Sequence, residues 1–410
     1  MAETGKKRAQ PLEGLKVLDL TSLLPGPLCT MILGDYGAEI IKVENVETGD
    51  PTRFAGSSYK GGKGPVGTLF KHLNRNKKSL ALDLKNEEGR EILKALAAAS
   101  DILVEGFRPG VMDRLGLGYR VLSGLNGRLV YAAITGYGYK GPYRDKAGHD
   151  LNYTALSGLL ELSAGEDGKP VVPATQIADI GGGALMALNG IMFALYERER
   201  TGAGRFVDVS MTRGLLPWLA YPASFLDAGA ELPRCGRGLL SGSFACYNIY
   251  ETGDGKFMSL GALEPVFWRR FCEAVGKEQW IDRQYAQEQD QPVGNRELIQ
   301  EVRTLFKSKS RKEWEVIFAN LDACCEPVLD LNEAIKHPLS QEGNYWLEAT
   351  PAKAAKTTRV GFPLLFSGQV GELRLPPPEH GEHTLEILEK LDYDYSDLEE
   401  MKKRGIIKTS

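Results

Sequence analysis

The chain has 410 residues, of which 42% are hydrophobic and 25% are charged, and its formal net charge is −4. These fractions are typical of folded proteins and exclude the disordered, collagen-like and coiled-coil classes. The 50 basic and 54 acidic residues nearly balance, so there is no electrostatic reason to expect a nucleic-acid partner. A soluble enzyme that acts on a small molecule is therefore the leading class.

The first 140 residues alternate between short apolar runs and helical patterns. The predicted strands are 16–20, 38–44, 80–84, 101–107 and 128–138. Helices are expected after the turn Pro25-Gly26-Pro27 and over 86–98. Strand and helix alternation of this kind predicts an α/β fold with an open parallel sheet, whose ligand lies at the carboxyl ends of the strands.

The second half of the chain contains a long apolar helix and then a different pattern. Gly181–Gly183 begin the helix, which ends at Thr201-Gly202, and a strand follows at 205–211. Two strand patterns joined through Gly253-Asp254-Gly255 predict a hairpin, and helical patterns fill 267–322. We expect a large domain at 10–225, a smaller α+β domain at 226–330, and a segment 331–410 that returns to the large domain and carries a capped helix from Thr384.

Cellular location is predicted from two segments and the cysteines. The N-terminal ten residues, MAETGKKRAQ, have no apolar stretch, which predicts that there is no secretory signal. The longest uncharged run, 180–196, is shorter than the about 20 apolar residues of a membrane span. Six cysteines without a C-x-x-C pair fit a reducing compartment. We therefore expect a cytoplasmic protein with no membrane partner and a buried helix at 180–196.

Several familiar functional motifs are absent. The sequence has no G-x-G-x-x-G after the first strand, no P-loop and no G-x-S-x-G, which counts against dinucleotide, P-loop and ordinary serine-hydrolase sites. His380 and His383 lie three residues apart without a third ligand, so no metal site is predicted.

One histidine and one aspartate stand out by their positions. His149 follows the strand that ends near Tyr137, and Asp179 lies at the expected start of the long helix. Free N–H groups and the helix dipole there would keep Asp179 ionised, and the two side chains would form an acid–base pair. The alternative, which the spacing leaves open, is that Asp179 caps its helix and His149 hydrogen-bonds within its loop.

Six longer motifs in the sequence resemble those of a known family. They are PLEGLKVLDLTSLLPGPLCTMILGDYGAEIIKVE, LNRNKKSLALDLK, VEGFRPGVMDRLGLGY, GHDLNY, ADIGGG and EHGEHTLEIL. From about Leu12 to Ile407 the chain resembles the family III coenzyme A transferases of the CaiB/BaiF type, a superfamily that also holds the α-methylacyl-CoA racemases. The resemblance implies a Rossmann-like large domain, a smaller domain and a homodimer of interlocked chains.

The resemblance implies two chemistries that share one carboxylate. In the transferases the aspartate matching Asp179 carries a covalent acyl intermediate and CoA moves between carboxylic acids. In the racemases it works with the histidine matching His149, which Glu264 of the G-A-x-E-P segment supports. The transferases usually have an aromatic residue at position 149 and a glycine-rich loop where this chain has 238–244. The chain is therefore closest to the racemase branch.

For a racemase, chemistry requires a base on each face of C2 of the acyl thioester, because inversion passes through a planar enolate. We expect His149 with Glu264 on one face and Asp179 on the other, and N–H groups of Gly181–Gly183 at the enolate oxygen. No cofactor is expected beyond the coenzyme A moiety of the acyl-CoA substrate. A CoA transferase, and a non-catalytic acyl-CoA-binding protein, are the alternatives.

The resemblance also assigns positions that contact coenzyme A. They are Leu82, Lys85, Gly106, Phe107, Arg114, Asp150 and Tyr153. Leu82 would line the adenine pocket, and lysine and arginine suit the phosphate groups. Many members have an arginine where this chain has Asn45, which removes one expected contact. Lys77 and Lys78 are interpreted as a solvated basic surface.

Overall fold

The computed structural model describes residues 9–54, 67–165, 167–286, 294–343, 345–349, 357–367 and 369–410. It divides into two compact units, each described here by itself. Unit 1 contains the described residues up to Ser157, Pro173–Leu216 and those from Glu342 onward, and unit 2 contains Gly158–Val172 and Pro217–Gln341. The domain borders expected from the sequence fall after 225 and 330, and the short segment 158–172 was not expected to separate from the large domain.

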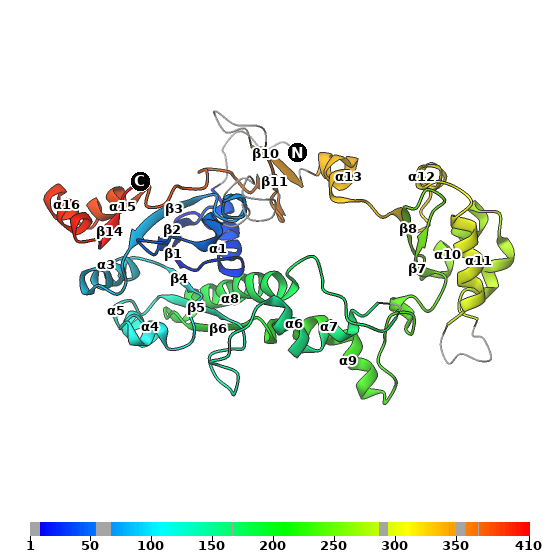
Figure 1. Cartoon of the computed structure of the whole chain (residues 1–410), viewed down its shortest axis with the longest axis horizontal. Coiled ribbons are helices and arrows are strands. Elements are labelled where there is room, and N and C mark those ends of the chain that lie inside the picture. Colours follow the sequence, from blue (N-terminus) through cyan, green and yellow to red (C-terminus); the bar gives the residue numbers. More distant parts are fainter. Residues whose placement is uncertain are drawn as a thin grey trace. The chain divides into compact units, whose positions relative to one another are not determined.

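Unit 1 is built on a seven-stranded sheet in the order β14-β3-β2-β1-β4-β5-β6 (Figure 1). Its strands are β1 (Lys16–Leu20), β2 (Glu39–Glu44), β3 (Lys77–Leu82), β4 (Ile102–Glu105), β5 (Val130–Thr135), β6 (Phe206–Ser210) and β14 (Ile407–Lys408). All pairings are parallel except that of β14 with β3. The predicted open parallel sheet is confirmed, although β3 begins three residues before the predicted position.

Helices cover both faces of this sheet. One face packs against α3 (Glu87–Ala98), α4 (Val111–Arg114), α5 (Tyr119–Leu125), α15 (Thr384–Glu389) and α16 (Tyr395–Lys403) in a single apolar core. The other packs against α1 (Pro25–Asp35) and α8 (Met186–Thr201), which continues from the π-helical η3 (Ala178–Leu185). Helices on both sides explain why the strands are apolar nearly throughout rather than alternating.

The long helix ends where the sequence predicted. Gly202 adopts the left-handed conformation (φ +72°) and its N–H bonds to the Arg198 carbonyl, a common helix end. Among the described residues this helix, Ala178–Thr201, is the one long and apolar enough to cross a membrane, and half of its most apolar window is buried. It packs against α1, β5 and β6, so it is a core helix of the sheet domain.

The C-terminal segment lies beside the N-terminal half of the sheet, where α15 packs on β3 and β14 extends its edge (Figure 1). The helix starts at Thr384 as predicted, but its N-cap residue, His383, makes no side-chain capping bond. The expectation of a capped helix was wrong at this detail, because packing of Ile387 and Leu388 in the core stabilises the helix instead.

Unit 2 contains an antiparallel sheet of β7 (Tyr247–Glu251), β8 (Phe257–Gly261) and β9 (Cys325–Pro327), which confirms the hairpin. Its longer helices are α9 (Ala220–Asp227), α10 (Pro265–Ala274), α11 (Arg296–Phe306) and α12 (Arg311–Phe318). Trp268, Phe271 and Phe306 stack on one another in the core between α10, α11 and α12, and Trp314 packs against Phe306 at a tilt.

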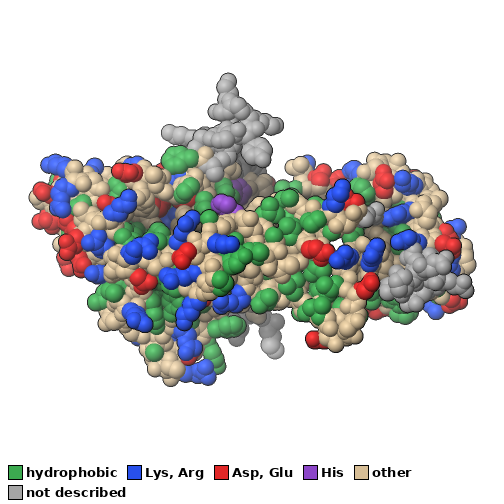
Figure 2. All heavy atoms as spheres, turned by 60° about the horizontal axis from the view of Figure 1, so that its bottom comes forward, with side chains coloured by type: hydrophobic (Ala, Val, Ile, Leu, Met, Phe, Trp, Pro, Cys, Tyr) green, Lys and Arg blue, Asp and Glu red, His purple; other side chains and the backbone are tan. Residues whose placement is uncertain are grey.

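The remaining elements are short. They are η1 (Pro51–Arg53), α2 (Thr68–Leu73), α6 (Asp150–Ser157), α7 (Leu159–Leu162), η4 (Arg213–Leu219), η5 (Leu239–Ser241), η6 (Glu278–Arg283), α13 (Leu331–Lys336), α14 (Pro338–Glu342), β10 (Trp346–Ala349), β11 (Thr357–Val360), β12 (Leu365–Phe366) and β13 (Gln369–Val370). On the face shown in Figure 2, acidic and basic side chains intermix without a large patch of one sign.

Candidate active site

A cavity of about 500 Å³ lies beyond the carboxyl ends of β1, β4 and β5 in unit 1. Its wall includes Leu23, Phe107, Tyr137, His149, Tyr153 and Asp179. Parallel sheets commonly bind ligands at this edge, where the loops after several strands meet. The structure thus brings the predicted histidine and aspartate into one cavity, although 29 residues separate the loops that carry them.

His149 lies exposed, one residue before α6. Its backbone is held in the loop, because its N–H donates to Asn152 Oδ1 (3.0 Å) and its carbonyl accepts from the N–H of Asn152 (2.8 Å). Within the described part of the chain, neither ring nitrogen has a hydrogen-bond partner. The backbone bonds therefore fix the place of the residue in its loop and leave both ring nitrogens open to exchange a proton with a ligand.

Asp179 is half-buried in the first turn of η3. Burial, together with the nearby Asp150 carboxylate, raises its pKa to about 6, and the nearby His149 opposes this. Its own N–H donates to Asp150 Oδ1 (2.9 Å), so the helix start binds the neighbouring carboxylate rather than its own. The helix start was expected to favour the ionised carboxylate, but burial and a like charge raise the pKa instead. With a pKa of about 6 the group is still mostly ionised at pH 7 and takes up a proton more easily than an ordinary carboxylate.

The glycines after Asp179 serve packing. Gly182 and Gly183 lie inside the π-helical turn, where a Cβ atom on Gly182 would meet the Met211 carbonyl oxygen at 2.3 Å. A Cβ atom on Gly183 would contact Pro25 at 3.0 Å. Both glycines lie within η3 rather than ahead of it, and the contact of the glycine N–H groups with an enolate oxygen stays a prediction.

Two tyrosines form part of the same wall. The rings of Tyr137 and Tyr153 meet edge to face at 5.1 Å, and the Tyr153 hydroxyl donates to the Gly148 carbonyl. Burial and then the Asp179 carboxylate raise the pKa of Tyr153 to about 12. A Cβ atom at Gly136 would collide with the Tyr153 ring at 2.4 Å. Tyr153 was expected from the sequence but Tyr137 was not, since its only signal was its place after a strand.

A second cavity, of about 240 Å³, receives three of the positions predicted to contact coenzyme A. Leu82, Lys85 and Phe107 line it, together with Asn45. Phe107 also lines the larger cavity, so the two cavities are neighbours. The small cavity has a mainly apolar wall, and its charged lining residues are Lys85, Glu44 and Asp83. The apolar wall suits a flat ring, and Lys85 suits a phosphate nearby.

The other predicted positions divide between the two cavities. Gly106 and Tyr153 line the larger cavity, and Asp150 adjoins it through its bond to Asp179. Arg114 lines neither cavity, but its helix α4 supplies Val111 to the small one. The Asn45 side chain accepts hydrogen bonds from the Glu47 and Thr48 N–H groups. Asn45, which replaces the arginine of many family members, therefore stabilises the loop that contains it.

Glu105 is a buried carboxyl group that the sequence analysis missed. It is 1% exposed at the end of β4, and its Oε2 accepts the Phe107 N–H at 2.7 Å. Burial raises its pKa to about 8, so the group is mostly protonated at neutral pH. Through this bond Glu105 fixes the backbone of the residue that lines both cavities. The sequence feature that could have identified Glu105 is an acidic residue within the apolar run DILVEGF.

The interpretation of Lys77 and Lys78 as a solvated surface was wrong for Lys77. Lys77 is fully buried, and its ammonium donates to four acceptors at 2.7–2.9 Å: Asp19 Oδ2, Pro27 O, Thr30 Oγ1 and Asn74 Oδ1. Lys78, with a third of its side chain exposed, pairs with Glu386. A solvated surface was not found at Lys77 because β3 is a strand covered on both faces.

Glu264 belongs to unit 2, where it is the exposed N-cap residue of α10 and makes no side-chain capping bond. Its support of His149 stays a prediction. Within the described ranges no group of three or more His, Cys, Asp or Glu residues is placed to hold a metal ion.

Comparisons with known proteins agree in one family. The sequence pattern of CoA-transferase family III matches residues 12–384. Human α-methylacyl-CoA racemase is 35% identical over 97% of this chain and 98% of its own. Human succinyl-CoA:glutarate CoA-transferase is 33% identical over 97% of this chain and 90% of its own. Among solved structures, a CaiB/BaiF family protein from Brucella suis matches with a TM-score of 0.78 and 26% identity, over 94% of this chain and 100% of that one.

Proposed function

Because this chain belongs to CoA-transferase family III and is an enzyme of the family's transferase and racemase type, we propose that it inverts C2 of a 2-methyl-branched acyl-CoA. The observation that carries the proposal is the presence of His149 and Asp179 in the wall of one cavity, with the pKa of Asp179 raised to about 6. Human α-methylacyl-CoA racemase, at 35% identity, supports it.

Inversion requires two proton carriers whose affinities for the proton are similar. With a pKa of about 6, the Asp179 carboxyl group takes up and releases a proton near neutral pH more readily than an ordinary carboxyl group does. Ionised Asp179 removes the C2 proton, the thioester becomes an enolate, and protonated His149 returns a proton on the other face. In the reverse direction the roles exchange. In either starting state one carrier holds a proton and the other does not, so proton transfer is matched to neutral pH.

The two cavities accommodate the rest of the substrate. In the proposed arrangement the adenine ring occupies the small cavity beside Leu82, and Lys85 pairs with a phosphate. The pantetheine arm passes Gly106 and Phe107 and brings the thioester into the larger cavity. The reaction needs no cofactor besides the coenzyme A moiety. We further propose that Glu264 supports His149, and that the protein is a cytoplasmic, interlocked homodimer.

The second candidate is a CoA transferase in which Asp179 attacks the thioester and becomes acylated. The observation in its favour is that succinyl-CoA:glutarate CoA-transferase resembles this chain almost as closely as the racemase does. In that reaction Asp179 must act as an ionised nucleophile, and His149 has no assigned role. A ring without a protein partner in the cavity wall favours proton transfer instead.

The experiment uses one enantiomer of a 2-methylacyl-CoA in deuterated buffer and follows loss of the C2 proton and change of configuration. We expect exchange with inversion in the wild type, and loss of both in His149→Ala and Asp179→Ala. Absence of exchange, with CoA transfer once a free carboxylic acid is added and an acyl adduct on Asp179 by mass spectrometry, would replace the racemase with the transferase.

A further inference from the structure

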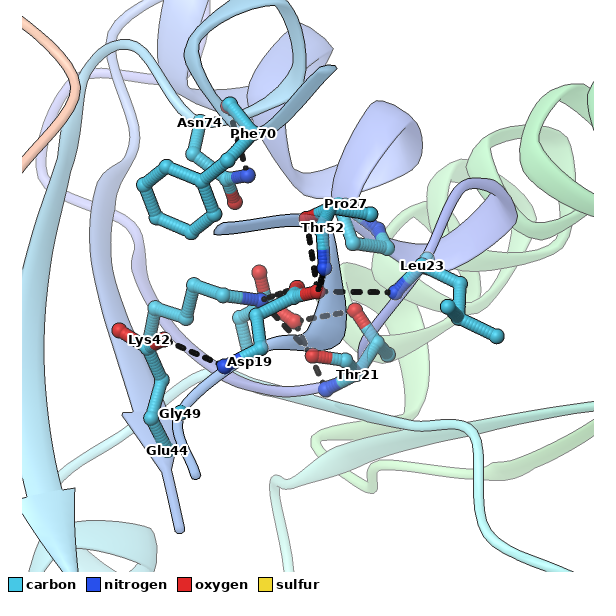
Figure 3. Close-up of polar contacts among 12 residues, drawn as sticks. Asp19, Thr21, Leu23, Pro27, Lys42, Glu44, Gly49, Thr52, Phe70 and Asn74 are labelled. Atoms are coloured by element: carbon cyan, nitrogen blue, oxygen red, sulfur yellow. Dashed lines mark hydrogen bonds and ion pairs between the residues drawn. The ribbon is translucent and has the colours of Figure 1, made fainter. Parts of the chain in front are cut away.

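A cluster of buried ionic side chains lies beneath one loop of the larger cavity. Its members, here called the ionic cluster, are Asp19, Lys42, Glu44, Asp50, Arg53 and Lys77. Three cations and three carboxylates balance the charge. The loop above them, Thr21–Leu23, lines the same cavity as His149 and Asp179. Figure 3 shows the contacts between the cluster and this loop.

The ionic cluster binds the loop backbone at Thr21. The Thr21 N–H donates to Asp19 Oδ1 at 3.0 Å, and the Lys42 ammonium donates to the Thr21 carbonyl at 2.8 Å. The same ammonium forms an ion pair with Asp50 Oδ2 at 3.0 Å. Lys42, Asp19 and Asp50 are at most 2% exposed. Buried charged groups with this many partners have little freedom to move, so the loop they bind is held firmly.

Leu23 is the strained residue of the loop. Its φ of +66° is a left-handed conformation that leucine rarely adopts, and such strain persists only where the surroundings enforce it. Its N–H donates to Asp50 Oδ1 at 3.3 Å, and the same oxygen accepts from Thr52. The Leu23 side chain extends away from the charged groups (Figure 3) and remains 47% exposed.

We propose that Leu23 determines which acyl groups the enzyme accepts, and that Asp50, itself held by Lys42, is the positioning residue that sets the Leu23 backbone. The proposal rests on the proposed function, because the acyl group must enter the cavity that contains His149 and Asp179. Leu23 presents an apolar side chain in that cavity. The direction of this side chain depends on the left-handed backbone conformation of Leu23, which leucine rarely adopts unless its surroundings enforce it.

The first arm of the test measures the ratio of kcat/KM for a bulky, ring-containing 2-methylacyl-CoA to that for a short one. Leu23→Ala removes the side chain, and we expect the ratio to rise about tenfold, as for loss of a few methylene contacts in a binding pocket. Asp392→Gly is the matched control, since Asp392 is also left-handed (φ +66°) but lies outside the cavity wall. It should leave the ratio unchanged.

The second arm separates Asp50 from general stability. Asp50→Ala and Asp50→Asn both remove the charge opposite Lys42, but only asparagine keeps an oxygen that accepts the Leu23 N–H. We expect the ratio to rise in Asp50→Ala and to stay within about twofold of the wild type in Asp50→Asn, a difference near the limit of ordinary mutational scatter. A loss of stability alone would lower the amount of active enzyme and leave both KM values unchanged.

Two results would overturn the inference: an unchanged ratio in Leu23→Ala, or equal ratios in the two Asp50 variants. If Asp50→Ala does not fold, Leu23→Ala and Leu23→Gly still decide whether the Leu23 side chain sets the ratio. Both remove that side chain, so both should raise the ratio, and glycine also adopts the left-handed conformation without strain. Failure of the proposed function is distinct, since the wild type would then exchange no C2 proton with either substrate.

Discussion

The backbone N–H of Asp179 donates a 2.9 Å hydrogen bond to Oδ1 of Asp150, a residue 29 positions earlier in the chain. This bond places a second carboxylate beside the proposed base. The two groups come from the starts of different helices, α6 and η3. The pKa of Asp179 is therefore set by a neighbour that local sequence does not reveal.

Asp150→Asn should lower the pKa of Asp179, because the Asp150 carboxylate is one of the groups that raise it. Asparagine keeps an oxygen for the Asp179 N–H, so the geometry is retained. We expect the acidic limb of kcat/KM for C2 proton exchange to move down by about half to one pH unit. Asp145→Asn, which changes an exposed acid of the same loop, should not move it. An unmoved limb in Asp150→Asn would contradict this account.

Asp179→Asn should be inactive in exchange but more stable than the wild type above pH 6. The folded-state pKa of Asp179 is raised from 3.8 to about 6, so the wild type binds the proton more tightly folded than unfolded. Its stability relative to the variant therefore falls as pH rises from about 4 to 6 and is constant above. We expect a gain of about 1–3 kcal/mol at pH 7.5 by urea unfolding, and little difference at pH 4. Equal stability at both pH values would argue against the raised pKa.

Glu105→Gln should preserve the fold, since glutamine still accepts the Phe107 N–H and matches the protonated acid. Because burial raises the pKa of Glu105 from 4.5 to about 8, ionisation weakens the wild-type fold as pH rises toward 8. The stability of Glu105→Gln relative to wild type should therefore increase between pH 5 and 8. Glu105→Ala leaves a buried N–H without its acceptor and should cost about 2–3 kcal/mol, with a higher KM for acyl-CoA. Identical pH dependence in Glu105→Gln and the wild type would disprove the assignment.

Lys77→Met and Lys78→Met form a matched pair on β3. Loss of the buried Lys77 ammonium removes the cation paired with Asp19 and should cost about 3–5 kcal/mol of unfolding free energy. Loss of Lys78 removes a partly exposed pair with Glu386 and should cost less than about 1 kcal/mol. Denaturant unfolding of both variants compares them directly. Equal costs would mean that the four acceptors around Lys77 contribute no more than a surface pair.

The sequence by itself determined the sheet and the loops that carry the site. Apolar runs such as KVLDL and VYAAIT predict buried strands, because a parallel sheet covered on both faces has no polar side. The GHDLNY loop and Asp179 were found because they follow strands or start helices, and those positions meet at one edge of such a sheet. These features depend on periodicity, which is local.

Only the tertiary structure decided the charge and the surroundings of the side chains. Lys77 is fully buried whereas its neighbour Lys78 is a third exposed, and Asp179 and Glu105 have pKa values far from those that their sequence positions suggest. The left-handed Leu23 depends on a carboxylate 27 residues away. Desolvation and electrostatic interaction depend on which groups meet in space, and no local pattern in the sequence records those meetings.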